Sequence, residues 1–330
     1  DSGVVEAGGT LDVTKSAVIW DGPATGAGIV IVNDGTITSD KRAFDTDGAV
    51  SGSYALTNNG TIVSTDDGFR LDDAFAGGDL TVINNGSITS EEGQAFDLNS
   101  ANDATAKVRI ENTGTITANA NDAVRLGGGT IVLVNSGTIQ TLSDEDRAIK
   151  FDDEANVETL QSFTLVNEAG GRILGGDDAI KIAADSDATS AVITIENHGL
   201  IDGGAGQALD FADLTSPDNV ITVINYGTLQ SSEADGIRPG GGARGVNYGV
   251  LQSHDRAGPG DGRDQGDVVA EAVDLVLVLH PGEEDFSTVR EPAPECLVGR
   301  RRQRQLQVGH VEGGGIGPLE APRSGELRHR

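Results

Sequence analysis

One short motif, Asn-x-Gly-x-Ile, recurs along most of the 330-residue chain and restricts its fold more than any other feature. Successive copies are 22 to 32 residues apart. A unit of this length cannot bury its own apolar face, so neighbouring units must stack to make a continuous core. The asparagines that anchor the copies are Asn33, Asn58, Asn84, Asn112, Asn135, Asn167, Asn197, Asn225 and Asn247.

Each asparagine ends a stretch in which aliphatic and polar residues alternate, as in Leu80, Thr81 and Val82. An alternation of period two predicts a strand with one buried face. Eight of the nine copies have glycine two residues after the asparagine. We expect these glycines to adopt the left-handed backbone conformation at a bend between two strands. The copy at Asn167 has Gly170 and Gly171 instead, and a degenerate copy at 4–11 lacks the asparagine.

A second strand is expected after each bend, with its central apolar residue 11 to 14 residues beyond the asparagine. The chain from there to the next asparagine varies from 10 to 18 residues, which predicts variable loops on one side of each unit. Stacked units would align one outward residue of this strand in a column, where five of seven neighbouring pairs are opposite in charge. We interpret the column as structural, because its alternating signs cancel the field that a ligand-binding stripe would need. It contains Asp45, Arg70, Asp97, Arg125, Lys150, Lys181, Asp210 and Arg238.

These patterns predict an all-β fold, a right-handed parallel β-helix of about nine to ten coils in residues 1–251. Each strand would pair in parallel with its equivalent one coil away, at a distance of about 4.8 Å. The stacked asparagine amides would then form a hydrogen-bonded ladder. Leucine-rich repeats are excluded because their dense leucine pattern is missing, and helical repeats because no segment keeps a 3.6-residue period.

The composition narrows the classes of function. A formal net charge of −29 excludes nucleic acid and anionic lipid as favoured partners, because phosphates would be repelled. The most apolar run, 268–279, contains Glu271 and Asp274 and is shorter than the roughly 20 residues that a spanning helix needs. We therefore predict no integral membrane segment in this chain.

Residues 252–330 differ sharply from the rest. They contain ten of the 18 arginines and the only cysteine, Cys296, but no asparagine or lysine, and no repeat can be aligned there. We predict an irregular or disordered tail. Its composition also fits a shifted reading frame in GC-rich DNA, which translation of the other two frames would test.

The Asn-x-Gly-x-Ile bend followed by an Ala-Ile-x-Leu or Ala-Ile-x-Phe strand resembles the passenger domains of bacterial autotransporters over roughly residues 4–251. The resemblance implies a β-helix of the pectin-lyase-like kind, exported across the outer membrane and displayed at the cell surface or secreted. It also implies an adhesin-like role, with a surface receptor, a glycan or self-association as the partner.

The main alternative function is that of a secreted carbohydrate-active enzyme. The segment Gly176-Asp177-Asp178 resembles the paired carboxylates of polygalacturonases, which share the β-helix and divide acid and base roles between two carboxyl groups. However, acidic residues occupy the same slot in most copies, so Asp177 and Asp178 are better explained as turn residues. We therefore predict no catalytic residues, no metal site and no cofactor. Ca²⁺ at the acidic turns stays an alternative, since it prefers clustered carboxylates.

Overall fold

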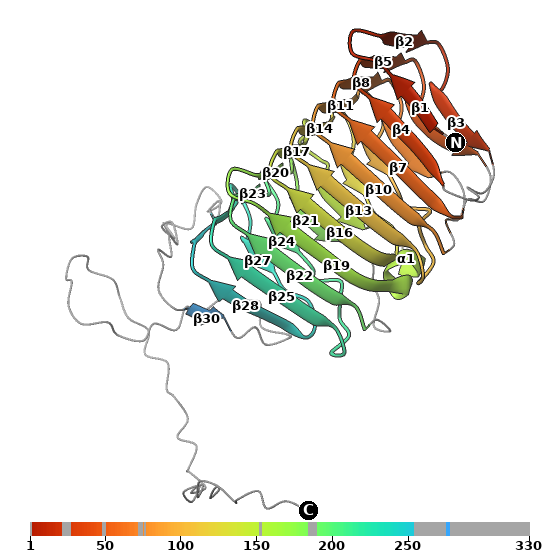
Figure 1. Cartoon of the computed structure of the whole chain (residues 1–330). Coiled ribbons are helices and arrows are strands. Elements are labelled where there is room, and N and C mark those ends of the chain that lie inside the picture. The colour runs from red at the N-terminus through yellow and green to blue at the C-terminus, as the bar shows by residue number, and fades with distance from the viewer. Residues whose placement is uncertain are drawn as a thin grey trace, which may run out of the picture. The chain divides into compact units, whose positions relative to one another are not determined.

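A computed structural model describes residues 2–21, 28–47, 51–71, 75, 77–151, 154–183, 190–253 and 275–277. The chain divides into two compact units, Asp1–Arg290 and Glu291–Arg330, and all described residues lie in the first. This unit contains a parallel β-solenoid of about eight turns, which confirms the all-β fold predicted from the repeat (Figure 1). The predicted nine to ten coils differ slightly from this count.

Sheet A is made of the strands that end at the anchoring asparagines, in chain order and all parallel apart from its last strand. The described strand β30 (Leu275–Leu277) ends this sheet by pairing antiparallel with β28. The other members are β1 (Ser2–Val5), β4 (Ile29–Asn33), β7 (Ser53–Asn58), β10 (Asp79–Asn84), β13 (Lys107–Asn112), β16 (Gly129–Asn135), β19 (Leu160–Asn167), β22 (Val192–Asn197), β25 (Val220–Asn225) and β28 (Ala243–Asn247).

Sheet B follows the bend and repeats the same order. It contains β2 (Thr10–Val13), β5 (Thr36–Ser39), β8 (Thr61–Ser64), β11 (Ser87–Ser90), β14 (Thr115–Ala118), β17 (Thr138–Thr141), β20 (Arg172–Leu174), β23 (Leu200–Asp202), β26 (Thr228–Ser231) and β29 (Val250–Ser253).

Sheet C holds the second strand expected from the sequence. Its members are short because each carries only the apolar residue and its immediate neighbours. They are β3 (Val18–Asp21), β6 (Phe44–Asp47), β9 (Phe69–Leu71), β12 (Phe96–Asp97), β15 (Val124–Arg125), β18 (Ile149–Phe151), β21 (Ile180–Ile182), β24 (Leu209–Asp210) and β27 (Ile237–Arg238).

The core consists of aliphatic columns along the solenoid axis. Leu80 and Val82 of β10 and Ile88 of β11 are buried, and their equivalents in the other coils stack on them in register. Each fully buried aliphatic side chain contributes about 1.5–3 kcal/mol of hydrophobic free energy. An aromatic cluster closes the N-terminal end of this core, where Trp20 lies 5.3 Å from Tyr54 and 5.4 Å from Phe69 between ring centroids.

The anchoring asparagines form the predicted ladder without interruption. Every Nδ2 from Asn33 to Asn225 donates to Oδ1 of the next asparagine at 2.7–2.8 Å. The same amide also reaches a backbone carbonyl of the next coil, as from Asn112 to Thr138 at 3.1 Å. The side chains are almost fully buried, so the bonds form away from water, where an unmade bond is costly.

The glycines of the bend have a different role from the one expected. The eight glycines of the Asn-x-Gly motif are not left-handed; in the bends only Gly8 and Gly170, which belong to the two variant copies, are. Other left-handed glycines, such as Gly52 and Gly242, lie directly before sheet A strands. Instead, a Cβ atom on Gly86 would lie 1.9 Å from the carbonyl oxygen of Gly60, one coil earlier. Gly114 meets Gly86 in the same way. The bend needs glycine because successive coils approach too closely for any side chain.

The variable side of each coil lies between sheet C and sheet A, as the spacing predicts. The described parts of these connections are not simply projecting loops, because Phe75, Ala101, Val157 and Leu214 are buried there. The only helix among the described residues, α1 (Glu154–Thr159), belongs to the longest unit. Its Asn156 donates to the backbone of Asn99 two coils away, at 2.8 Å. Much of this side therefore packs as a second layer.

The predicted boundary between 251 and 252 falls inside β29, which runs to Ser253. Apart from 252, 253 and 275–277, the predicted tail lies outside the described residues, so the reading-frame hypothesis stays a prediction.

Replacing Asn135 by alanine should lower the free energy of unfolding by roughly 2–4 kcal/mol, because one rung disappears and neighbouring polar groups lose partners. Asn247→Ala is the matched control at the last rung. There, Nδ2 donates to the carbonyl of Gly249 and no further asparagine follows in the sequence, so the loss should be smaller. Urea denaturation of both variants measures the difference. Equal losses of unfolding free energy in the two variants would contradict the explanation that each asparagine is stabilised by hydrogen bonds to both of its neighbours in the ladder.

Gly114→Ala should destabilise the solenoid by at least about 2 kcal/mol, because its new methyl group would overlap a backbone oxygen of the preceding coil. Gly170→Asn is the control. Gly170 has a φ of 89° and nothing within 4 Å of a Cβ, and asparagine tolerates this conformation. Thermal melting compares the two, and a Gly114→Ala variant as stable as wild type would refute the close-approach explanation.

Candidate functional site

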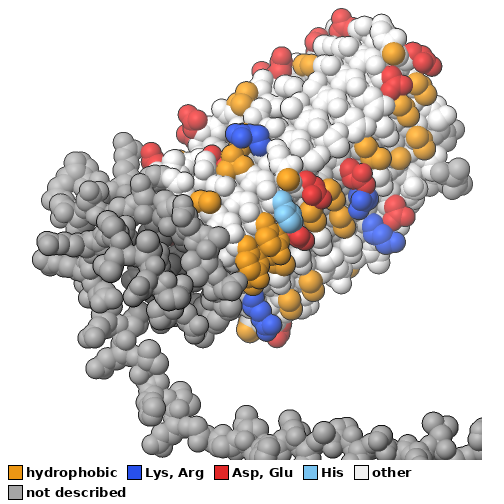
Figure 2. Space-filling model, turned by 60° about the vertical axis from the view of Figure 1, so that its left-hand side comes forward, with side chains coloured by type: hydrophobic (Ala, Val, Ile, Leu, Met, Phe, Trp, Pro, Cys, Tyr) orange, Lys and Arg blue, Asp and Glu red, His pale blue; other side chains and the backbone are white. Residues whose placement is uncertain are grey.

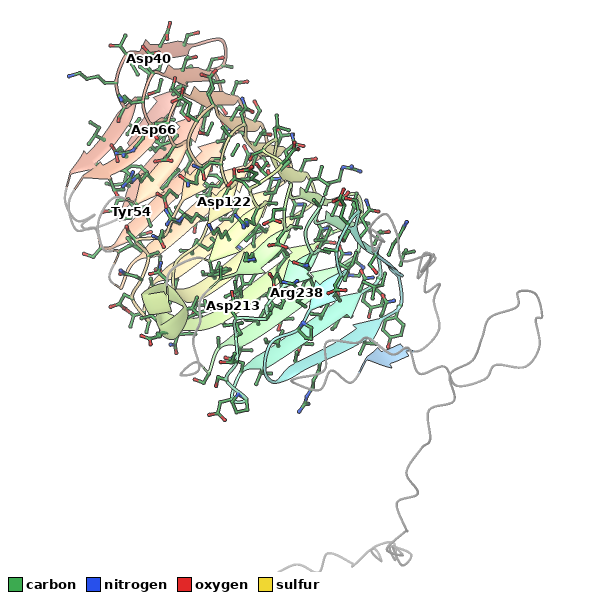
Figure 3. All side chains as sticks on the ribbon, turned by 180° about the vertical axis from the view of Figure 1, so that it is seen from behind. Asp40, Tyr54, Asp66, Asp122, Asp213 and Arg238 are labelled. Carbon is green, nitrogen blue, oxygen red and sulfur yellow. The ribbon has the colours of Figure 1, made fainter. Side chains whose placement is uncertain are left out.

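The charged column predicted from the sequence lies on the outer side of sheet C, in the expected register. Asp97 contacts Arg70 at 3.9 Å and Arg125 at 3.8 Å, and Asp210 contacts Lys181 at 2.9 Å. The labelled Asp66, Asp122 and Arg238 in Figure 3 mark this side of the solenoid along its length. The structural interpretation of the column therefore agrees with its contacts.

A second column lies in the turn, three residues before the first. The sequence showed acidic residues in this turn slot, but their alignment with arginines and glutamines into one column was missed because it lies outside the alternating pattern. The constant three-residue offset is the sequence signal that could have revealed it. Beside the run of three cations in the first column, this column supplies two acids: Lys150 contacts Asp122 at 3.4 Å and Lys181 contacts Asp178 at 3.1 Å. The second column contains Arg42, Asp67, Gln94, Asp122, Arg147, Asp178, Gln207 and Asp235.

Three aspartates of the second column hold successive coils together. Asp67 accepts a hydrogen bond from the backbone N–H of Gln94 at 3.0 Å, and Asp178 accepts one from Gln207 at 2.7 Å. Asp122 accepts the equivalent bond from Arg147 at 2.9 Å. All three carboxylates are nearly buried, so each one bridges to the coil that follows it.

The two carboxylates resembling a polygalacturonase pair belong to this arrangement. The side chain of Asp178 is 1% exposed and is engaged by Lys181 and by the backbone of Gln207. Asp177 is 41% exposed and contacts Arg147 at 2.8 Å. Asp178 occupies the same place as Asp67 and Asp122, as expected of a repeated turn residue, and burial raises its pKa.

Asp67 is the most strongly perturbed acid of the network. Burial is the largest cause, and the charges of Asp66 and Asp97 add to it, raising the pKa of Asp67 to about 6. The hydrogen bond from Gln94 and the charge of Arg70 oppose this rise but do not cancel it. The network therefore contains a carboxyl group that takes up a proton just below neutral pH.

The structure gives two further results on ligands and membranes. Within the described part of the chain, no group of three or more histidine, cysteine or acidic side chains has a geometry suited to a metal ion. No helix in that part is long and apolar enough to cross a membrane.

A third column follows the anchoring asparagines, at the variable position of Asn-x-Gly. It is polar in the early coils, where Asn59 donates to Asp34 at 2.7 Å and Asn85 to Asn59 at 2.8 Å. In the late coils it becomes aromatic. The rings of His198 and Tyr226 stack at 4.8 Å, and those of Tyr226 and Tyr248 at 5.1 Å. The stack could not be predicted from the repeat, because the residue at this position differs from copy to copy.

Exposed apolar side chains lie on sheet A both beside the stacked rings and at the opposite ends of β22 and β25, with Glu196 and Arg244 on the same face. Val192 and Val220 on sheet A are 45% and 49% exposed, and Tyr226 and Tyr248 are 48% and 43% exposed. We call Val192, Val220, Tyr226, Tyr248 and the half-buried Ile224 and Val246 the apolar patch. In Figure 2 hydrophobic side chains cluster next to the histidine. Exposed apolar patches are common at the contact surfaces of proteins.

Comparison with protein-family models, curated proteins and solved structures finds no match to this chain. Its function is therefore argued from its own side chains.

Asp67→Asn should stabilise the protein above pH 6 and have little effect below pH 4. The folded-state pKa lies above the ordinary value of 3.8, so stability present at low pH is lost as the pH rises through about 6. A shift of about two pKa units corresponds to at most about 3 kcal/mol. Urea denaturation at pH 4 and pH 7.5 measures this. Asp40→Asn, which removes an exposed acid, is the control, and an equal gain in both variants would exclude burial as the cause.

Proposed function

We propose that the chain is a structural and adhesive rod of the autotransporter-passenger kind, exported to the surface of a bacterial cell. The observation that carries this proposal is the unbroken asparagine ladder, which joins every coil from Asn33 to Asn247. A solenoid bonded in this way along its full length is suited to hold a contact surface at a distance from its attachment point.

Export suits this architecture, because each coil contacts mainly its neighbours in the sequence. Such a chain can fold progressively from one end as it emerges from a membrane, without waiting for distant segments. Residues 1–253 contain no cysteine, so their folding does not depend on the redox state of the compartment.

The distribution of charge supports a scaffold more than a catalyst. The buried aspartates of the second column are bonded to the following coil or to a cation, as Asp178 is to Gln207 and Lys181. Asp177 is likewise engaged by Arg147. A hydrolase would need two carboxyl groups facing a bound sugar, with one free to give up a proton and the other free to activate water.

The apolar patch is the proposed adhesive surface. Its rings are stacked along the axis, so their edges and hydroxyl groups face outward while their faces contact each other. This arrangement favours a protein receptor or another copy of the chain over a sugar bound flat against a ring. The Thr194 and Thr222 side chains between the valines and the bend extend the neutral part of the surface.

The test is adhesion of the full chain, immobilised on beads, to a panel of extracellular-matrix proteins, neutral glycans and the chain itself. The double variant Tyr226→Ser with Tyr248→Ser should lose at least tenfold in bound beads. Leu142→Ser is the control, because it removes an exposed apolar side chain at a different corner. Failure of the folded wild type to bind anything, or hydrolysis of polygalacturonate that disappears in Asp178→Asn, would contradict the proposal.

A further inference from the structure

The outer face of sheet B carries a regular grid of hydroxyl groups. In β5, β8, β11, β14 and β17 the second residue is always a buried isoleucine, and the residues on either side of it face outward. Most of these outward side chains are half-buried, and Thr117 is 8% exposed. Eight of these ten outward positions are threonine or serine. The grid consists of Thr36, Thr38, Thr61, Val63, Ser87, Thr89, Thr115, Thr117, Thr138 and Gln140.

The grid is two columns wide, and its rows are in register. Thr36, Thr61, Ser87, Thr115 and Thr138 follow one another as direct partners of parallel strands. Neighbouring rows are about 4.8 Å apart, and the two columns about 6.6 Å, twice the rise per residue of a strand. Threonine is stiff at χ1, so its methyl and hydroxyl groups hold fixed directions without a large entropic cost on binding.

The grid is also uncharged, which is unusual in a chain of net charge −29. None of its ten side chains is ionisable, although sheet B carries Asp12 before the grid and Arg172 and Asp202 after it. In Figure 2, where the side with sheet B comes forward, a largely white band without charged or hydrophobic side chains runs along the solenoid. This face therefore complements an uncharged partner and offers nothing to a charged one.

We propose that this hydroxyl grid binds ice. A surface with two regular repeats fits a partner that itself repeats in two dimensions, as the oxygen lattice of an ice face does. Waters held by the hydroxyl groups, with methyl groups between them, take up positions that belong to the crystal. Many weak contacts made together on a rigid surface give strong attachment.

A soluble neutral glycan fits the grid less well. Sugar sites combine aromatic faces with branched polar side chains that make several hydrogen bonds, and the grid has no aromatic residue. Part of its hydroxyl capacity is already used between rows, since Ser87 donates to Thr61 at 3.4 Å and Gln140 to Thr117 at 3.2 Å. The inference needs only the fold of these five coils and holds whether or not the apolar patch is adhesive.

The experiment measures how much of the full-length protein enters a slowly growing ice hemisphere, and whether the protein shapes single ice crystals. Wild type should be enriched in the ice fraction and should produce faceted crystals. Thr89→Lys places a long charged side chain in the middle of the grid and should reduce enrichment at least tenfold.

Thr81→Lys is the matched control, because it makes the same change in the same coil at an outward threonine between two buried aliphatic residues on sheet A. It should behave as wild type, and circular dichroism should show both variants folded. Wild type excluded from ice, Thr89→Lys enriched like wild type, or equal losses in both variants would each overturn the proposal. Binding to an insoluble neutral polysaccharide in place of ice would overturn it too.

Discussion

The structure depends on the stacking of identical positions at one fixed spacing. Asparagine meets asparagine, isoleucine meets isoleucine and glycine meets glycine because the backbone ladders of three parallel sheets impose the same register on every coil. The buried amide ladder makes this register costly to change. A slip by one residue would place an aliphatic side chain opposite an unsatisfied amide. The glycine column enforces the same register sterically, since only glycine allows the carbonyl of the preceding coil to approach so closely.

The same register explains how a chain with 52 acidic residues folds into a closely packed stack. Carboxylates that would repel one another along the axis are offset by cations in the first column and by backbone N–H groups in the next coil. At Asp67 these contacts do not compensate for burial and for the charges of neighbouring acids, so the pKa of Asp67 is raised. The charge network therefore holds coils together and leaves few acids in that region free for chemistry.

Much of this could be predicted from the sequence, because the repeat reports the stacking directly. The strands, the asparagine ladder and the column from Asp45 to Arg238 follow from periodicity alone. The role of the bend glycines could not be predicted, since a left-handed backbone and a close approach both require glycine. The second charge column lies in turns, where no alternation of apolar and polar residues shows which side chains face outward. The stack of Tyr226 on Tyr248 depends on a position that looks unconstrained in any single copy.

In this structure one continuous ladder of hydrogen bonds joins residues 33 to 247 into a single rod. Native-state hydrogen exchange, followed peptide by peptide by mass spectrometry, tests it most directly. Protection of the bend amides should be highest in the central coils around Asn112 and Asn135 and should decrease smoothly towards both ends, because each coil is held by its two neighbours. A band of fast exchange within the central coils, with slow exchange on both sides, would show that the ladder is broken and would contradict the account.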